Sequence, residues 1–412
     1  GDDAYQALLR QSTGALENLR ARLVNGTLPF LDMGEAAGGL YWLEPIAENY
    51  IEAFDHVVCL GVGGSSLGAK TLCALAAPPA AGERPRLHFM DNIDPDSFAV
   101  LFGAIDPART GFIVTSKSGA TAETLTQFLI ALDWMRSALP GVPLGDHFTI
   151  ITQPGPRPLR RLAEEFAMTI LDHDANIGGR YAGLSVVGLL PALIAGLDGE
   201  ALRQGAADTL QPLLDGAGPE DFAPAIGAAI NVGLAQTAGV TATVMMPYLD
   251  RMEEFGAWYR QLWAESLGKN GLGTTPIRAL GTVDQHSQLQ LYLDGPGGMM
   301  FTLITGPAKG VGGMIDAKLA TEAGLGYLAG HRMGDLLDAE QRATAAALTQ
   351  YKRPVRIISL ERLDEAAMGA LMMHFMIETV IAAHLLGVNA FDQPAVEAGK
   401  VLARRTLEED RP

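Results

Sequence analysis

The stretch HVVCLGVGGSS (residues 56–66) joins a short apolar run to a glycine-rich turn and the start of a helical pattern. Four more apolar runs follow and alternate with helical patterns, at residues 87–90, 111–115, 148–151 and 168–171. Apolar strands without polar alternation are buried on both faces, and strands that alternate with helices pair in parallel. This first half therefore predicts a parallel sheet with helices on both faces.

A second set of strands follows a long helical region. Residues 183–238 are rich in Ala and Leu, and Gly216–Pro219 break them. Candidate strands then stand at residues 241–246, 275–279, 299–304 and 355–359. The sequence predicts an α/β fold of two doubly wound parallel-sheet domains. The expected order is an N-terminal helical segment (1–48), a first domain (49–215), a second domain (216–388) and a C-terminal helical tail (389–412).

Composition limits the classes of function. The 412 residues are 48% hydrophobic and carry a net charge of −17. Nucleic-acid and membrane-surface binding need positive patches, so neither partner is expected. The only two cysteines, Cys59 and Cys73, stand in apolar settings and indicate a reducing cytoplasm rather than a disulfide framework. No membrane span and no signal peptide are expected.

The glycine-rich turn at residues 61–68, GVGGSSLG, has three interpretations. A helix N-terminus offers free N–H groups to an anion, and Gly64 and Ser65 stand where a phosphate could approach. A dinucleotide-binding turn is an alternative, although Ser66 occupies the place of its third glycine; Asp91 could then contact a ribose. The third interpretation is structural: the glycines permit the turn and the serines cap the helix.

A second polar turn, TSKSGATAET at residues 115–124, also follows a strand. Its side chains Ser116, Lys117, Ser118 and Thr121 could wrap a phosphate monoester with hydroxyl, ammonium and amide donors. The alternative is that Thr121 and the residues after it only cap the helix.

Two further segments place charges near apolar helices. Arg180 follows two glycines at 178–179, and it could present a planar set of donors to an oxyanion. Glu265 lies in LWAESLGK (262–269), and apolar surroundings would raise the proton affinity of its carboxylate and make it a candidate base. For both residues, a solvated surface charge is the competing interpretation.

His286 lies in GTVDQHSQ (281–288) beside polar neighbours, and Gln393 and Lys400 lie in FDQPAVEAGK (391–400) near the end of the chain. A lone histidine is more often structural than catalytic, and Lys400 could equally be a surface side chain. No metal site is expected, because we find no His/Cys or acidic cluster with metal-ligand spacing.

The spacing Ser-x-Ser-Gly-x-Thr at residues 116–121 resembles the phosphosugar loop of sugar isomerase (SIS) domains. Together, and in order along the chain, these segments resemble the glucose-6-phosphate isomerase family. The resemblance implies two SIS domains, a homodimer with its active site between subunits, and no cofactor. It also implies interconversion of glucose 6-phosphate and fructose 6-phosphate by a glycolytic, cytoplasmic enzyme.

The resemblance also implies roles for single residues. Ser65, Ser116, Lys117, Ser118 and Thr121 would bind the phosphate and Gln393 would lie near the sugar. Arg180 would stabilise the enediolate and Glu265 would move the proton. His286, supplied by the neighbouring subunit, and Lys400 would assist ring opening.

Departures from the family pattern leave alternatives. The loop Ser-Lys-Ser-Gly-Ala-Thr is similar to that of dual phosphoglucose/phosphomannose isomerases, and Leu267 stands where the family usually has Asn. Val283 and Asp284 change the histidine segment. A dual isomerase, a non-catalytic sugar-phosphate-sensing SIS protein and, third, an NAD-dependent enzyme therefore remain to be separated.

Overall fold

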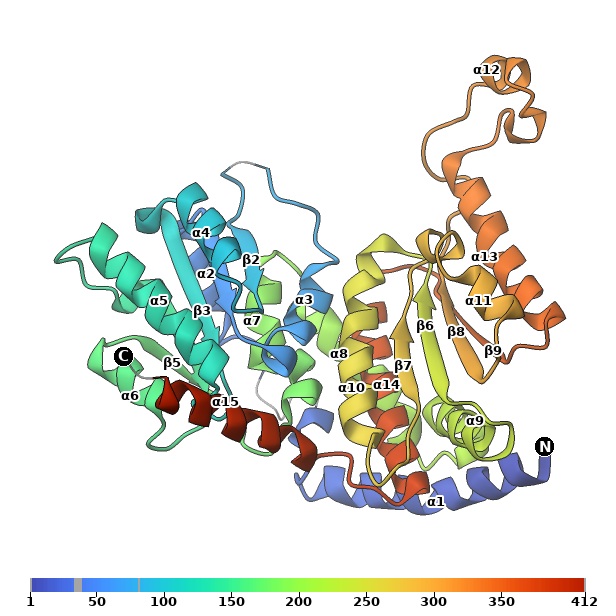
Figure 1. Ribbon diagram of the computed structural model, residues 1–412, viewed down its shortest axis with the longest axis horizontal. Coiled ribbons are helices and arrows are strands. Elements are labelled where there is room, and N and C mark those ends of the chain that lie inside the picture. The colour runs from blue at the N-terminus through green and yellow to red at the C-terminus, as the bar shows by residue number, and fades with distance from the viewer. Residues whose placement is uncertain (1, 33–38, 81, 411–412) are drawn as a thin grey trace.

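The computed structural model describes residues 2–32, 39–80 and 82–410. Two helices, α1 (Asp2–Val24) and α2 (Glu44–Ala53), precede the first sheet. That sheet is fully parallel, with strand order β2-β1-β3-β4-β5 (Figure 1). Its strands are β1 (His56–Leu60), β2 (Arg86–Met90), β3 (Thr110–Thr115), β4 (Phe148–Thr152) and β5 (Thr169–Asp172). All five strands predicted for the first half are confirmed to within two residues.

The second sheet is also parallel, with order β7-β6-β8-β9. Its strands are β6 (Ala242–Pro247), β7 (Thr275–Arg278), β8 (Met299–Thr305) and β9 (Val355–Ser359). The doubly wound α/β fold is thereby confirmed in both halves. In each sheet the first strand has a neighbour on each side, because the second strand pairs with one edge of it and the third strand pairs with the other.

Helices cover both faces of the first sheet. Side chains of α4 (Pro95–Ala104), α5 (Ala122–Ala138) and α6 (Pro158–Glu165) form one core with the alternate residues Val58 and Phe112 of the strands. The opposite strand residues, such as Val57, pack in a second core with α2, α3 (Leu67–Cys73) and α7 (Val186–Ile194). This alternation of inward side chains is what a strand period of two produces.

A helical layer joins the two sheets. It contains α8 (Gly199–Leu214), α9 (Ala223–Thr237), α10 (Glu253–Leu267) and α14 (Glu365–Leu386). Glycines let α8 and α14 touch, because a Cβ on Gly205 or Gly369 would overlap the facing backbone. Helix α14 is long and apolar enough to cross a membrane, but 78% of its apolar window is buried inside the protein, as in a core helix of a soluble domain.

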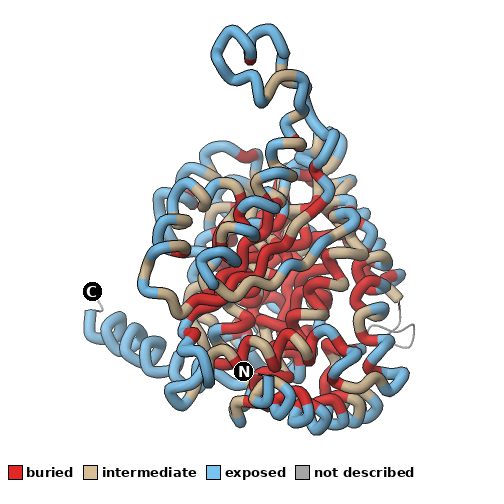
Figure 2. The backbone as a smooth tube through the Cα atoms, turned by 90° about the vertical axis from the view of Figure 1, so that its right-hand side faces the viewer, coloured by how far each residue is buried: buried red, intermediate tan, exposed pale blue. Residues whose placement is uncertain are grey.

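Two parts stand apart from the body, as Figure 2 shows by their exposure. One is the projection between β8 and α13 (Met333–Gln350), which carries α12 (Ala317–Glu322). The other is α15 (Glu397–Glu409), which has no buried residue. The remaining helix, α11 (Leu289–Asp294), follows β7.

Candidate active site

The candidate site lies at β1 and β3, where the order in which the chain adds strands to the first sheet reverses. Leu60 at the end of β1 pairs with Val114 near the end of β3, so the turns after these two strands lie side by side. One turn leads to α3 and the other to α5, which cover opposite faces. The crevice between two such turns is where open α/β sheets bind ligands. Both turns need a left-handed glycine, Gly63 (φ 57°) and Gly119 (φ 60°).

The turn after β3 gathers the predicted hydroxyl groups. Ser116 Oγ donates to Thr121 Oγ1 at 3.0 Å, and Ser118 Oγ lies 3.4 Å from the same atom. Thr121 is the N-cap residue of α5, yet its side chain makes no capping hydrogen bond. The capping alternative for Thr121 is therefore wrong. The first N–H groups of α5 therefore receive no side-chain cap from Thr121, and unpaired N–H groups at a helix start beside hydroxyls suit an anion.

The same correction applies to the turn after β1. Ser66 is the N-cap residue of α3 and makes no side-chain cap, and within the described part of the chain its buried Oγ has no hydrogen-bond partner. Ser65 ends the 3₁₀ turn Gly63–Ser65 and is half-buried. The interpretation that the serines cap the helix through their side chains is therefore wrong.

Lys117 shares the crevice with two residues that the sequence analysis missed. Burial lowers the pKa of Lys117; Asp174 opposes this shift and Arg180 adds to it. Burial likewise lowers the pKa of His173, whose Nδ1 contacts the carbonyl of Asp174 at 2.8 Å. The sequence could have indicated both residues, because His173 and Asp174 stand directly after β5, at the carboxyl end of the sheet.

Glycines bring the first turn against the arginine. A Cβ on Gly64 would overlap the backbone of Gly179 and Arg180, and one on Gly68 would lie 2.6 Å from Gly183 Cα. Close backbone contact between the two glycine pairs therefore places Arg180 beside the turn after β1. This is the physical reason for glycines on both sides of the contact.

Arg180 is 3% exposed and directs every N–H donor at an oxygen atom. Nε reaches Ser266 Oγ (2.8 Å); Nη1 reaches Glu265 Oε2 (3.1 Å) and Gln393 Oε1 (2.9 Å); Nη2 reaches the carbonyls of Ala390 (2.6 Å) and Asp392 (3.1 Å). A guanidinium has five N–H groups, so all of them are in use. Three segments far apart in the sequence meet at this one side chain.

Glu265 lies near the end of α10 in a polar setting. Its Oε2 pairs with Arg180, and its Oε1 accepts from Gln261 Nε2 at 3.0 Å. The expectation of apolar surroundings is therefore wrong, because Leu262 and Trp263 are buried elsewhere in the core. Gln261, four residues earlier on the same helix face, also packs on Gly63, since a Cβ there would lie 2.9 Å from Nε2. The sequence analysis missed Gln261, although the spacing of four was its signal.

The structure does not bring His286 and Lys400 to this cluster within one chain. His286 is exposed and follows β7 at the carboxyl edge of the second sheet, where Gly281 N donates to Pro247 O. Helix α10 runs back from that edge, so Glu265 lies near the opposite edge of the sheet. Lys400 lies on exposed α15 and pairs with Glu397 at 2.7 Å.

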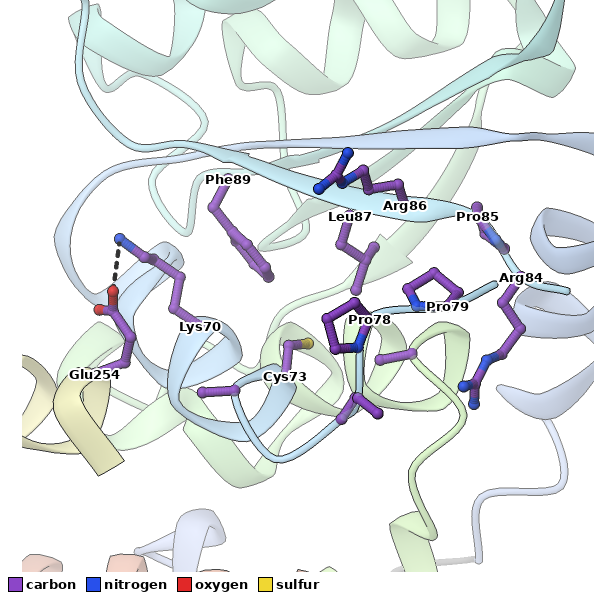
Figure 3. Close-up of a pocket in the computed structure, with 14 residues that line it drawn as sticks. Lys70, Cys73, Pro78, Pro79, Arg84, Pro85, Arg86, Leu87, Phe89 and Glu254 are labelled. Atoms are coloured by element: carbon purple, nitrogen blue, oxygen red, sulfur yellow. Dashed lines mark ion pairs between the residues drawn. The ribbon is translucent and has the colours of Figure 1, made fainter. Parts of the chain in front are cut away.

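A separate cavity of about 340 Å³ lies behind α3 and contains none of the predicted site residues (Figure 3). Its walls are mostly apolar, and at one end Lys70 is paired with Asp91 (3.0 Å) and Glu254 (3.5 Å). Across residues 2–32, 39–80 and 82–410, no group of three or more His, Cys, Asp or Glu side chains is placed to hold a metal ion.

The sequence pattern of phosphoglucose isomerases matches residues 48–291 and 332–412 of this chain. The chain belongs to the phosphoglucose isomerase family. It is 42% identical over 355 residues to a glucose-6-phosphate isomerase of Rubrobacter xylanophilus, which covers 84% of this chain and 80% of that protein. It is 36% identical over 369 residues to the one of Thermus thermophilus, which covers 88% and 85%.

Solved structures agree with membership of the phosphoglucose isomerase family. A hypothetical protein from Thermus thermophilus superposes with a TM-score of 0.86 at 33% identity, over 98% of this chain and 97% of that one. A glucose-6-phosphate isomerase from Chlamydia trachomatis has the same fold, with a TM-score of 0.75 at 23% identity, over 90% and 74%. The family assignment of the sequence analysis is thereby confirmed.

Proposed function

We propose that this chain interconverts glucose 6-phosphate and fructose 6-phosphate by proton transfer at the crevice of the first sheet. The observation that carries the proposal is the Arg180–Glu265 pair, 3.1 Å apart, beside a hydroxyl-lined turn at the start of a helix. A carboxylate, a fixed cation and a phosphate site are the three elements that an aldose–ketose isomerisation requires. Relatives named glucose-6-phosphate isomerase support the same reaction.

The phosphate would occupy the turn after β3. Ser116, Ser118 and Thr121 offer hydroxyl donors, Lys117 adds an ammonium, and the N-terminus of α5 adds backbone N–H groups. Gly64 and Ser65 line the facing turn after β1. Binding energy from this remote phosphate orients the reacting carbons.

Proton transfer would then take place between Glu265 and the sugar. In the open-chain aldose, the carboxylate removes the C2 proton while the electron pair of that bond moves toward the carbonyl oxygen. The resulting enediolate is an anion, and Arg180 stabilises its charge. The hydroxyl proton passes from O2 to O1, and return of the first proton from Glu265 to C1 while O2 becomes the carbonyl oxygen gives the ketose. The base is thereby regenerated and no cofactor takes part.

Ring opening needs a proton donor and an acceptor, which we assign to His286 and Lys400. Because His286 and Glu265 of one chain lie at opposite edges of the second sheet, we propose a homodimer in which His286 enters the site of the other subunit. Lys400 would come from α15, which continues from Gln393 at the site. We place this enzyme in the cytoplasm, where Cys59 and Cys73 would stay as free thiols.

Mixed dimers test this arrangement. Glu265→Gln and His286→Ala should each be inactive, but unfolding and refolding them together should restore turnover. One site of a mixed dimer then carries both changes and the other carries neither, by the symmetry of a two-fold interface. The measurement is turnover of fructose 6-phosphate by the protein without added metal or nucleotide, with the glucose 6-phosphate determined after the reaction is stopped. Mixed dimers verified by mass that stay inactive would refute the shared site.

A dual phosphoglucose/phosphomannose isomerase is the second candidate, favoured by the small residues Gly119 and Ala120 in the phosphate turn. The same assay with mannose 6-phosphate decides between the two. A kcat/KM for mannose 6-phosphate within about 10-fold of that for glucose 6-phosphate, equivalent to about 1.4 kcal/mol, would establish dual specificity.

A further inference from the structure

The segment Asn389–Gln393 crosses the site and is held by two cations. From one side Arg180 binds the carbonyls of Ala390 and Asp392 and the Gln393 amide oxygen. From the other side Lys269 Nζ binds Asp392 Oδ1 (3.0 Å) and donates to the carbonyl of Asn389. We call residues 389–393 the strap, because they connect α14 of the second half to the exposed helix α15.

Lys269 is itself fixed to the helix that carries Glu265. It follows Gly268, where α10 ends, and its Nζ donates to the carbonyl of Ser266 at 2.9 Å. A lysine that binds the last carbonyls of a helix is stabilised by the helix dipole. Its side chain is only 11% exposed, so the ammonium has one geometry rather than many.

The ion pair between Lys269 and the strap exists at neutral pH. The hydrogen bond from Lys269 is the largest cause that holds the pKa of Asp392 below its ordinary value; Asn389 and Arg180 lower it further. Arg180 is the other cation that hydrogen-bonds to the strap among the described residues. The ring of Phe391 adds contacts with Tyr181 and with Arg22, which lies 5.0 Å from its centre, but Lys269 and Arg180 make the charged hydrogen bonds to the backbone and to Asp392.

Arg180 cannot serve the strap and the substrate with the same hydrogen bonds. All five of its N–H donors have acceptors in the free protein, so an enediolate oxygen must displace at least one of them. The Nη1 partners, Glu265 and Gln393, are the residues that the proposed mechanism brings to the reacting carbons. An Nη1 that turns to the substrate would lose its contact with the strap at Gln393, and only the Nη2 contacts with Ala390 and Asp392 would remain.

We propose that Lys269 is a positioning residue that keeps the strap in place while Arg180 exchanges its partners. It thereby fixes Gln393 and the start of α15, from which Lys400 must reach the sugar. The inference rests on the proposed role of Arg180. Lys269 itself touches no reacting atom.

Lys269→Met tests the proposal, because it retains the length of the side chain and removes the charge and the donors. We expect kcat to fall by about 10- to 100-fold, which is the effect of misplacing reacting groups by about 1 Å. The KM should stay within about 2-fold, since the phosphate turn lies on the first sheet. Lys269→Arg retains a cation and should recover most of the lost kcat.

A second readout separates positioning from general stability. Hydrogen–deuterium exchange of the substrate-free protein should rise at residues 389–396 in Lys269→Met and stay unchanged in the first sheet. Lys318→Met is the matched control, because Lys318 is 82% exposed on α12, far from the strap in sequence, and forms an ion pair with Glu322 at 3.8 Å. It should alter neither kcat nor the exchange of the strap.

Several outcomes would overturn the proposal: an unchanged kcat, an increase in exchange that is spread over the whole molecule, or no recovery with Lys269→Arg. If Lys269→Met fails to fold, Asp392→Asn removes the same ion pair and must show the same local increase in exchange with a smaller loss of kcat. An inactive wild-type chain would refute the proposed function, whereas the exchange experiment would still decide whether Lys269 holds the strap.

Discussion

The two sheets wind in the same way, but the turns at their switch points differ in their side chains. In the first sheet, β3 ends at Thr115 and continues as Ser-Lys-Ser-Gly-Ala-Thr; in the second, β8 ends at Thr305 and continues as Gly-Pro-Ala-Lys-Gly-Val. Where the first sequence offers hydroxyls, the second offers Pro307 and Ala308. Topology provides the place for a ligand, and side chains decide whether the place can bind one.

The turns after the first strand of each sheet differ in the same way. After β1, the glycines of Gly61–Ser65 let the backbone of Gly179 and Arg180 approach closely, whereas after β6 the side chains of Tyr248 and Leu249 occupy the corresponding turn. Tyr248 is 1% exposed, and its hydroxyl donates to Gln285 Oε1 at 2.6 Å. Leu249 packs on Gly306, where a Cβ would lie 2.9 Å from its Cδ1. The second sheet contributes to the site through α10 instead, at the other end of its strands.

Removing the base should give the largest effect. Glu265→Gln retains the contact with Gln261 and loses the proton acceptor, so kcat should fall by at least about 10³-fold, within the range of general acid–base catalysis. Coupled assays and exchange of the C2 hydrogen with solvent measure it. Glu253→Gln, on the same helix but exposed beside Arg278, is the control and should leave kcat unchanged. Near-normal hydrogen exchange in Glu265→Gln would assign the proton transfer to another group.

Closing the crevice should have the next largest effect. In Gly64→Ala the new methyl group overlaps the backbone of Gly179 and Arg180, so the turn after β1 must move away from the arginine. Overpacking of this kind costs about 1–3 kcal/mol of stability. We expect that loss in urea unfolding, together with a fall in kcat/KM. Gly103→Ala, in α4 with open space around it, should show neither loss.

Weakening the phosphate site should act on binding rather than on chemistry. Lys117→Ala removes a charge-assisted contact worth about 1.5–3 kcal/mol, so KM should rise by about 10- to 100-fold with a small change in kcat. Initial rates at several substrate concentrations separate the two constants. An unchanged KM would place the phosphate on the other turn, at Ser65.

Opening the second switch point should change function least. Leu249→Ala removes part of the side chain that fills the space after β6, and should cost about 1–3 kcal/mol of stability. Binding of inorganic phosphate, measured by calorimetry, should stay at one ion per chain, because Pro307 and Ala308 provide no hydroxyl donors. A second bound phosphate in this variant would show that the volume of the Leu249 side chain, and not the lack of hydroxyl donors, prevents phosphate binding at the second sheet.

The sequence predicted the fold well, because the central strands are continuous apolar runs buried on both faces. Val57–Leu60 and Ala242–Pro247 show why: every residue of these runs is buried, so no polar position obscures the pattern. Residues in the turns after strands could also be predicted, since parallel strands end at one edge. Ser116, Lys117 and Ser118 were found in this way.

Contacts between distant segments could not be predicted from local patterns. The prediction that Glu265 has apolar surroundings was wrong, because its sequence neighbours Leu262 and Trp263 are buried in the core beneath α10. Gln393 and Arg180 are 213 residues apart, and no periodicity links them. His173 was missed, although it stands directly after β5.

The five-donor cluster at Arg180 also has a consequence for synthesis and folding. Two of its acceptors lie 85 and 86 residues downstream, and the other three lie 210 to 213 residues downstream. Contacts of such separation form late, because long loops must close before they contribute energy. A nascent chain can complete the first sheet while the ribosome is still adding α14. The chain should become active only after residues 390–393 have emerged and joined Arg180. A shorter nascent chain would therefore be partly folded but inactive.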